Sequence, residues 1–564
     1  MSGVCRTGGG FVSRFTGTVL AVTSALALVA GSAAAAVAAP APGAAAEAKV
    51  APVDWKPCNP DPSQPDPKIY DCAVYQVPLD YDHPKGETTG IAMMRRRAAD
   101  PAKRIGSLFL NPGGPGGSGY LWATTTRFGK DVQDRFDLVG FDPRGVARSN
   151  PLKCFTTDEE AAAVNDRMIG VPVTRAEIAQ TIDATEDYSD ACSRNAGPLI
   201  EHMSTINVVR DLDRMRRAVG DSKLNFAGFS YGTLIGATYA GMYPDKVRAL
   251  IVDGNVDPNL RMHNGVEYDR QRATGFEVAL TEFLKRCQTA GAPRCAFGEG
   301  DTRAKFDTLR DHLRTNPITL PDGTQVTLSS FTSQVASSLY AQRLQAPLAV
   351  SLQAAYQVLN APAAAAQSLA AAAPAVDPAV DPAVVENAKV LAKTVPNALR
   401  EALPETPYSS DDSYYGVNCQ DKPYPSNPWT LANLAKPWEK ESPTFGRYQA
   451  FDGPTCASWP APARDAETFT GPAETFTGPW NRKTAAPVMV IGNLYDPATN
   501  YGFAQRMQRQ LGNAVLVSVD VVEHCAVGRS KELNKLVTDY LVNQKAPAPG
   551  QLLKPDAEAF PPVA

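Results

Sequence analysis

A single serine stands between two glycines in the stretch LNFAGFSYGTLIGATYA, residues 224–240. The residues before Ser230 suit a buried strand and those after it are small and apolar, so the stretch predicts a strand, a sharp turn and a helix. In such a turn, side chains at Gly228 and Gly232 would collide with the neighbouring strand and helix. The layout is that of a nucleophile elbow, which exposes the serine oxygen. A simple structural turn is the alternative, because the chain has 42 glycines.

Runs with the character of buried strands recur along the chain. Besides the run before Ser230, they are GSLFLNPGG, FDLVGFDPRG, VRALIVDGN, APVMVIGN and AVLVSVD. Helix-length amphipathic segments, such as residues 207–220, lie between several of them. Strands that alternate with helices predict a mostly parallel sheet covered on both faces, so the expected fold class is α/β.

The alternation stops after Asp257. From there to about Ser410 the pattern is largely helical, and it includes a low-complexity stretch rich in alanine and proline. Strand-type runs return only near Pro487, which predicts a helical cap inserted over the carboxyl edge of the sheet. The expected parts are a signal peptide at 1–39, the first part of the core at 40–257, the cap at 258–410, the second part of the core at 411–545 and a tail at 546–564.

The N-terminus is typical of an export signal, because Arg6 and Arg14 precede an apolar run at residues 19–29 and small residues follow that run. The run is short for a membrane anchor, and no later segment is long and apolar enough to span a bilayer. We therefore expect a secreted protein without a stable membrane anchor. The formal net charge of −4 gives no electrostatic footprint for nucleic acid.

The cysteines agree with an oxidising destination. Nine remain after removal of Cys5 with the signal, and eight of them fall into neighbouring pairs along the chain. Eight cysteines allow about 105 pairings. The simplest framework joins Cys58 to Cys72, Cys154 to Cys192, Cys287 to Cys295 and Cys419 to Cys456, and it leaves Cys525 unpaired. Zinc binding is disfavoured, because no C-x-x-C motif is present and the histidines lie far from the paired cysteines.

A serine nucleophile needs a base and an orienting acid, and in α/β-hydrolases the acid and then the histidine follow the serine in the chain. Asp496 follows the strand-like run PVMVIGN, and His524 follows the next run, AVLVSVD. The other histidines precede the serine or lie in the expected cap; they are His83, His202, His263 and His312. We therefore expect His524 as the base and Asp496 as the acid. Asp253, after the run ALIVDG, is the rival acid.

The loop NPGGPGGSG, residues 111–119, follows a strand at the place where N–H donors for an oxyanion are expected. Its glycines allow the backbone to approach a substrate closely. A phosphate-binding loop is disfavoured, because the Lys-Ser/Thr pair of a P-loop is missing and the dinucleotide spacing is not met. No metal or cofactor is expected.

Several motifs resemble those of one family, the secreted tripeptidyl aminopeptidases of actinomycetes, which are relatives of proline iminopeptidase with an α/β-hydrolase fold. The motifs are NPGGPGGSG, DLVGFDPRGVARS, RDLDRMRRAVGDSKLNFAGFSYGT, VNCQDKP, CASWP and GNLYDPATNY, and the resemblance spans about Trp55 to Leu541. It implies Ser230 as nucleophile, Asp496 as acid and His524 as base. It also implies the backbone N–H groups of Gly114 and Tyr231 as the oxyanion hole.

The resemblance implies a serine exopeptidase that releases short peptides, tripeptides foremost, from free N-termini through an acyl-enzyme. A carboxylate would hold the substrate amine, and Asp421, Glu277 and Glu523 are the candidates. Glu523 also departs from the family, in which glycine commonly precedes the histidine, so the pH optimum and the specificity stay open. An esterase or amidase acting on small acyl substrates would use the same triad. A non-catalytic binding protein is a weaker alternative, because all three triad residues are present.

Overall fold

The computed structural model describes residues 50–63, 65, 67–361, 408, 412–460 and 474–562. All of them belong to one compact unit that spans Val50 to Ala564. The predicted signal peptide, 1–39, and the low-complexity part of the predicted cap lie outside the described residues.

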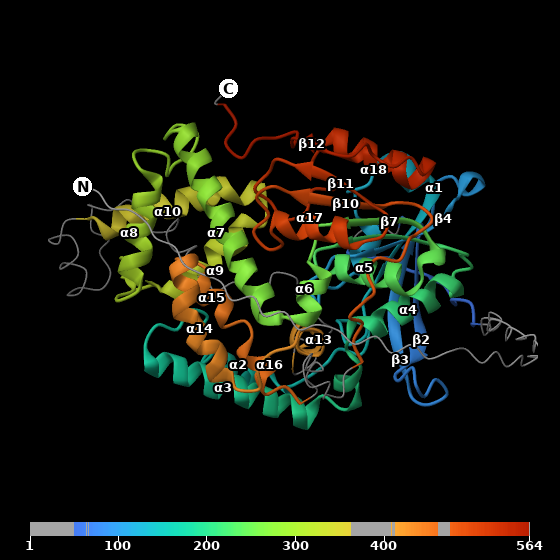
Figure 1. Ribbon diagram of the computed structural model, residues 1–564, viewed down its shortest axis with the longest axis horizontal. Coiled ribbons are helices and arrows are strands. Elements are labelled where there is room, and N and C mark those ends of the chain that lie inside the picture. Colours follow the sequence, from blue (N-terminus) through green and yellow to red (C-terminus); the bar gives the residue numbers. More distant parts are fainter. Residues whose placement is uncertain are drawn as a thin grey trace, which may run out of the picture. The chain divides into compact units, whose positions relative to one another are not determined.

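Within the described residues, ten strands form one sheet in the order β1-β2-β3-β5-β4-β6-β7-β10-β11-β12 (Figure 1). The strands are β1 (Lys56–Pro57), β2 (Tyr70–Pro78), β3 (Thr88–Arg96), β4 (Gly106–Asn111), β5 (Phe136–Phe141), β6 (Leu224–Phe229), β7 (Val247–Asp253), β10 (Val488–Asn493), β11 (Ala514–Val519) and β12 (Gln551–Leu553). The strands from β5 to β12 in this order pair in parallel, and β1, β2 and β3 join antiparallel at one edge. A small separate hairpin consists of β8 (Ile318–Thr319) and β9 (Gln325–Val326).

The register of the central strands brings their carboxyl ends to one edge of the sheet. Asn111 of β4 pairs with Gly228 of β6, and Phe229 of β6 pairs with Asp253 of β7. Asp253 in turn lies opposite Ile491 of β10. The loops that follow these four strands therefore meet at the same edge, as is general for ligand sites in open α/β sheets.

Helices cover both faces of this sheet, because its central strands are buried along their whole length. The helices next to the sheet are α1 (Lys130–Arg135), α4 (Thr205–Ala218), α5 (Gly232–Met242), α17 (Tyr501–Gln510) and α18 (Lys531–Asn543). The α/β fold with a mostly parallel sheet, predicted from the alternating pattern, is confirmed.

A second group of helices forms a cap with its own apolar interior. Its members are α6 (Pro258–His263), α7 (Gly265–Ala290), α8 (Thr302–Leu313), α9 (Leu328–Leu339), α10 (Gln345–Leu359), α13 (Ser413–Asp421), α14 (Pro428–Glu441), α15 (Gly446–Ala450) and α16 (Pro454–Ala457), and α2 (Asp158–Asn165) and α3 (Arg175–Asn195) extend it. Phe283, Phe306 and Phe331 are fully buried in the cap interior. In Figure 1 helices α7 to α10 lie to the left of the sheet, and α2, α3 and α14 to α16 lie below them.

The structure differs from the expected domain boundaries at two places. Residues 413–457, expected in the second part of the core, form helices α13 to α16, of which α14 and α15 pack on α7 and α14 and α16 pack on α3. The sheet resumes only at Val488. The expected tail, 546–564, contains β12, which pairs in parallel with β11. A three-residue edge strand carries too short a pattern to be recognised in the sequence.

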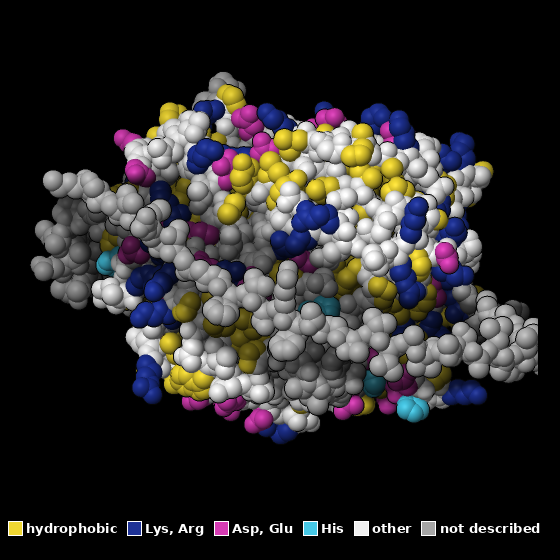
Figure 2. Space-filling view, in the orientation of Figure 1, with side chains coloured by type: hydrophobic (Ala, Val, Ile, Leu, Met, Phe, Trp, Pro, Cys, Tyr) yellow, Lys and Arg dark blue, Asp and Glu magenta, His cyan; other side chains and the backbone are white. Residues whose placement is uncertain are grey.

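The face of the molecule in Figure 2 carries basic and acidic side chains interspersed with one another, in keeping with the small net charge of −4. None of the described helices is long and apolar enough to cross a membrane.

Among the described residues, four disulfide bonds join the pairs predicted from neighbouring positions: Cys58–Cys72, Cys154–Cys192, Cys287–Cys295 and Cys419–Cys456. Cys525 is free and buried, and its thiol donates a hydrogen bond to the carbonyl oxygen of Asp253. Burial raises the pKa of the Cys525 thiol to about 11, so the reactive thiolate is scarce at neutral pH.

We predict that the native protein does not react with a thiol reagent such as DTNB at pH 8, because Cys525 is both buried and protonated. After unfolding in guanidinium without reductant, one thiol per chain should react. The measurement is the absorbance of the released thionitrobenzoate before and after unfolding, with Cys525→Ser as the control that should release none. Fast reaction of the native protein would contradict the burial of this thiol.

Candidate active site

Ser230 lies at the turn between β6 and α5, with a φ of 56° that places it in the left-handed region. A non-glycine residue adopts this conformation only where its surroundings enforce it. A Cβ atom on Gly228 would lie 2.2 Å from the carbonyl oxygen of Gly232, and one on Gly232 would lie 2.7 Å from the carbonyl oxygen of Asn111. Both glycines of the elbow are thus required by close backbone contacts, which was the expectation from the sequence.

His524 lies in the loop after β11, and its Nδ1 is 3.0 Å from each carboxylate oxygen of Asp496. Its Nε2 is buried and has no hydrogen-bond partner among the described residues, so this nitrogen is the one available to accept a proton. The flat face of the ring lies against Gly254, where a Cβ atom would come within 2.9 Å of Cε1. The ring of Tyr340 stands edge-on to the imidazole, with 5.2 Å between the ring centroids.

Asp496 is held in the loop after β10 by two backbone donors. The N–H groups of Ala498 and Thr499 donate to its Oδ1 at 3.0 and 2.8 Å. The side chain is buried, with an exposed fraction of 1%. A carboxylate fixed in this way keeps the imidazole of His524 in one orientation, with Nδ1 as the protonated nitrogen.

The pKa of His524 reflects two opposed effects. Burial disfavours the charged imidazolium, but the adjacent carboxylate of Asp496 outweighs burial and raises the pKa well above the ordinary value for histidine. An imidazole stabilised as its cation is a stronger proton acceptor, which suits a general base.

Asp253, the rival acid, does not contact the imidazole through its carboxylate. Its Oδ2 accepts hydrogen bonds from the N–H groups of Ala526 and Val527, both at 2.8 Å, and its backbone oxygen accepts one from the N–H of Ser230 at 2.9 Å. Asp253 therefore joins the serine turn to the histidine loop. Burial raises the pKa of its carboxyl group to about 6.

The glycine-rich loop after β4 lies beside the serine. A Cβ atom on Gly113 would come within 2.7 Å of Cβ of Ser230 and 2.9 Å of the backbone nitrogen of Tyr231. Asn111 and Asp142 hold the two ends of the loop, because Asn111 Oδ1 accepts the N–H of Gly113 at 3.0 Å and Asp142 accepts the hydroxyl of Ser118 at 2.6 Å.

A small cavity of about 40 Å³ opens at Ser230. Gly114 and Tyr231, the two residues expected to supply the oxyanion hole, line it. Cap helices complete its wall with side chains that the sequence reasoning did not single out: Arg261 of α6, Tyr268 and Arg272 of α7, and Tyr414 and Asn418 of α13. Tyr268 and Arg272 are four positions apart on α7, and Tyr414 and Asn418 are four positions apart on α13. The two members of each pair therefore lie on the same face of their helix.

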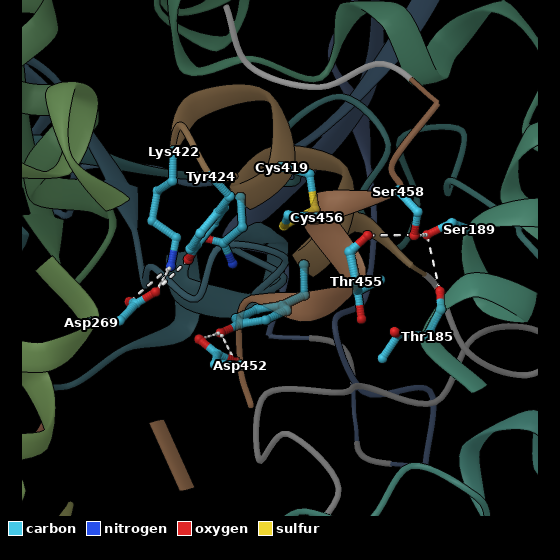
Figure 3. The surroundings of a disulfide bond; sticks show 12 residues. Thr185, Ser189, Asp269, Cys419, Lys422, Tyr424, Asp452, Thr455, Cys456 and Ser458 are labelled. Atoms are coloured by element: carbon cyan, nitrogen blue, oxygen red, sulfur yellow. Dashed lines mark hydrogen bonds and ion pairs between the residues drawn. A yellow bond between two sulfur atoms is a disulfide. The ribbon is translucent and has the colours of Figure 1, made fainter. Parts of the chain in front are cut away.

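A buried group of charges lies behind the wall that α7 and α13 form. Lys422 Nζ is 2.9 and 3.1 Å from the two carboxylate oxygens of Asp269, and the hydroxyl of Tyr424 donates to the same carboxylate (Figure 3). Burial lowers the pKa of Lys422. The Cys419–Cys456 disulfide joins α13 to α16 beside this group (Figure 3).

Asp452 is an acidic residue that contacts two side chains of the cavity wall. The hydroxyl of Tyr414 lies 2.9 Å from both of its carboxylate oxygens, and Arg272 Nη1 lies 3.0 Å from Oδ2. Its side chain keeps an exposed fraction of 24%. Burial would raise the pKa of Asp452, but the guanidinium of Arg272 and the ammonium of Lys422 hold it below its ordinary value.

The three carboxylates considered for the substrate amine have other partners. Asp421 accepts both the N–H and the hydroxyl of Thr205, at 3.0 and 2.6 Å. Glu277 pairs with Arg303 at 3.0 Å in the cap, and Glu523 pairs with Arg529 at 2.8 Å.

None of these three carboxylates lines the cavity at Ser230. Within the described residues, no three histidine, cysteine, aspartate or glutamate side chains lie together as metal ligands would.

The fold and the Ser230 turn define the class of protein. A profile of the alpha/beta hydrolase fold family matches residues 106–526. The chain belongs to this family, and within it to the group of serine hydrolases that includes tripeptidyl aminopeptidases and the Hip1 serine protease.

Three relatives show how far the likeness extends. The chain is 30% identical to serine protease Hip1 of Mycobacterium tuberculosis, over 88% of this chain and 90% of that protein. It is 30% identical to the tripeptidyl aminopeptidase of Streptomyces lividans, over 91% of this chain and 88% of that protein. It is 29% identical to carboxylesterase B of Mycobacterium tuberculosis, over 81% of each chain.

The two aspartates should respond differently to amidation. We predict that Asp496→Asn lowers kcat by roughly 10⁴, because an amide favours the wrong tautomer of His524, whereas Asp253→Asn costs less than about tenfold. An asparagine at 253 can still accept the N–H groups of Ala526 and Val527 through its Oδ1. The measurement is kcat for both variants on one chromogenic substrate, and the reverse ranking would transfer the acid role to Asp253.

Asp253 should also make stability depend on pH. Its pKa of about 6 in the folded protein exceeds the unfolded value of about 3.9, so the folded state binds the extra proton between these two pH values. The free energy of unfolding should therefore rise by about 2 kcal/mol from this group as pH falls from 7 to 4. Urea unfolding of wild type and Asp253→Asn at several pH values measures the difference, and identical pH dependence in both proteins would contradict it.

The raised pKa of His524 predicts an alkaline pH profile. Only the neutral imidazole can accept the serine proton, so kcat/KM should rise with pH through an apparent pKa above 6.5. In Asp496→Asn the stabilising carboxylate is lost while burial remains, so the rising limb should move to lower pH. Glu523→Gln is the control: this carboxylate pairs with Arg529, and its removal should leave the limb in place.

Proposed function

We propose that this chain is a secreted serine exopeptidase that releases short peptides, with tripeptides as the expected fragment, from free N-termini. The observation that carries the proposal is the small cavity at Ser230, which cap helices α6, α7 and α13 wall in. The similarity to a tripeptidyl aminopeptidase over 91% of this chain supports it further.

Ser230, His524 and Asp496 are the proposed catalytic residues. His524 Nε2 takes the proton of the Ser230 hydroxyl as its oxygen attacks the scissile carbonyl, and Asp496 orients and stabilises the imidazolium that forms. The N–H groups of Gly114 and Tyr231 stabilise the oxyanion. The imidazolium then gives its proton to the departing amine, and water attacks the acyl-enzyme in a second, equivalent cycle. The chemistry of these residues needs no cofactor.

The closed wall favours an exopeptidase over an endopeptidase. An endopeptidase needs a groove that accepts chain on both sides of the scissile bond. Here the side chains of Tyr268, Arg272 and Tyr414 crowd the cavity at the nucleophile. A wall at this position leaves room for a short acyl segment that ends in its own N-terminus.

Asp452 is the carboxylate that we assign to the substrate's α-ammonium. It keeps 24% of its side chain exposed, and its two direct partners, Tyr414 and Arg272, both line the cavity. A charge-assisted hydrogen bond to an ammonium would fix the distance from the N-terminus to Ser230, and with it the length of the released fragment.

The proposed location is outside the cell. Four disulfide bonds are typical of proteins that fold in an oxidising compartment. The N-terminal pattern of Arg6, Arg14 and a short apolar run supports export.

An esterase acting on small acyl substrates is the second candidate, because carboxylesterase B is 29% identical over 81% of this chain. The same triad would serve either reaction. The two functions differ in whether the free amine of the substrate contributes to binding.

We predict that N-acetylation of a tripeptide anilide lowers kcat/KM by roughly 30-fold to several thousand-fold. Acetylation removes the charge of the amine and leaves its carboxylate partner unpaired in a partly desolvated site, a loss of about 2 to 5 kcal/mol. The measurement compares H-Ala-Ala-Ala p-nitroanilide with its acetylated form. Equal rates for the pair would favour the esterase.

Three variants act as controls. Ser230→Ala should lower kcat by on the order of 10⁵ to 10⁶ on both anilides. Asp452→Asn should bring the two rates together by slowing only the substrate with a free amine. Glu277→Gln removes a cap carboxylate that pairs with Arg303, and it should leave the ratio between the two anilides unchanged.

A further inference from the structure

Two buried hydrogen-bond donors in the wall of the cavity at Ser230 have no acceptor. Arg261 Nε and Asn418 Nδ2 lack a hydrogen-bond partner among the described residues. Both residues line the cavity, and their exposed fractions are only 4% and 3%. A buried donor without an acceptor is unfavourable, so two of them in one wall call for a ligand that supplies an acceptor.

The two donors are held rigidly. Arg261 Nη2 donates to Asn418 Oδ1 at 2.7 Å, which fixes both side chains and assigns Nδ2 as the remaining amide donor. The guanidinium carbon lies 5.8 Å from the ring of Tyr231 and 5.5 Å from the ring of Tyr268. A site with such fixed donors can discriminate between ligands that carry an acceptor and ligands that do not.

The donors lie on the acyl side of the nucleophile. The leaving group must be within reach of His524 Nε2, which returns the proton, and Tyr340 is a cavity residue whose ring contacts this imidazole. Arg261 contacts Tyr231 instead, which follows the serine. A group that meets Arg261 and Asn418 therefore belongs to the part of the substrate that becomes attached to Ser230.

We infer that Arg261 and Asn418 bind the main-chain carbonyl oxygen of the residue that precedes the acylated residue. A carbonyl oxygen accepts two hydrogen bonds, which matches two donors. The inference rests on the proposed function only in taking the acyl group to be a peptide.

This contact sets a lower limit on substrate length. A single amino acid attached to a leaving group has no preceding carbonyl, so it leaves both donors unpaired. A substrate with two or more residues on the acyl side satisfies them whatever its side chains are. The site thus selects peptides over single amino acids without selecting a sequence.

The test compares two esters that differ at the position of this carbonyl. When the ester carbon is counted as atom 1 of the acyl chain, atom 4 is a carbonyl carbon in the p-nitrophenyl ester of N-acetylglycine. In p-nitrophenyl pentanoate, atom 4 is a methylene carbon. Esterases and exopeptidases both cleave such esters, so a failure of the proposed function on peptide anilides would leave this test intact.

Asn418→Asp is the informative variant, because it keeps an oxygen for Arg261 and replaces the free donor by an acceptor. We expect kcat/KM for the N-acetylglycine ester to fall roughly 10- to 100-fold relative to that for the pentanoate. Asn427→Asp adds the same charge at an exposed helix cap and should leave the ratio unchanged. An unchanged ratio in Asn418→Asp would overturn the inference.

Two further readouts complete the test. In the wild-type protein, kcat/KM for each ester is divided by the rate constant for hydroxide-catalysed hydrolysis of the same ester. This normalised value should be more than about tenfold higher for the N-acetylglycine ester than for the pentanoate. Equal normalised values would overturn the inference without the need for a variant. Tripeptide anilides ending in asparagine or leucine test the side chain as the source of the oxygen. Loss of a preference for asparagine in Asn418→Asp, with no change in the ester ratio, would overturn the main-chain assignment.

Discussion

The hydrogen bond from the N–H of Ser230 to the backbone oxygen of Asp253 connects the two strands on which the site depends. It continues the parallel ladder between β6 and β7 by one step, into the strained turn that holds the serine. The Asp253 carboxylate then reaches the N–H groups of Ala526 and Val527 in the histidine loop. One residue that is itself fully buried thus fixes both Ser230, the proposed nucleophile, and the loop that carries His524, the proposed base. A site built on strand ends in this way inherits the rigidity of the sheet.

In the proposed function, the cap supplies the selectivity and the core supplies the triad. Ser230, Asp496 and His524 follow strands of the sheet, whereas Arg261, Arg272 and Asn418 come from helices α6, α7 and α13. Chemistry and recognition are therefore encoded in different parts of the chain. This division agrees with relatives that include two peptidases and an esterase at about 30% identity.

The fold and the geometry of the turn at Ser230 could be predicted from the sequence because each depends on a local pattern. The elbow needs Gly228 and Gly232 for steric reasons that any sequence window reveals, and the central strands are apolar because both of their faces are buried. The residues of the cavity wall could not be predicted in the same way. Asn418 lies within VNCQDKP, a stretch already noted for its family resemblance, but its contact with Arg261 joins positions 157 residues apart and follows only from how the cap packs.

The bounds of the cap helices could not be predicted for a related reason. Helices α13, α15 and α16 are short, so no periodic pattern separates them from the core that follows. The candidates for binding the substrate amine were chosen because they are carboxylates, and a sequence does not show which other side chains each carboxylate contacts. Asp421, Glu277 and Glu523 each have a partner elsewhere, which only the packed structure reveals.

The Cys419–Cys456 disulfide makes the stability of the cavity wall depend on the redox conditions of the cellular compartment. It is the covalent link between α13, which carries Tyr414 and Asn418, and α16. A crosslink that closes a loop of this size contributes about 2 to 4 kcal/mol to the folded state, and it forms only under oxidising conditions. If the chain is exported as proposed, it lacks this support for the cavity wall until it leaves the reducing cytoplasm. Formation of this disulfide on export would thus stabilise the cavity wall in the compartment where the proposed peptide substrates are found.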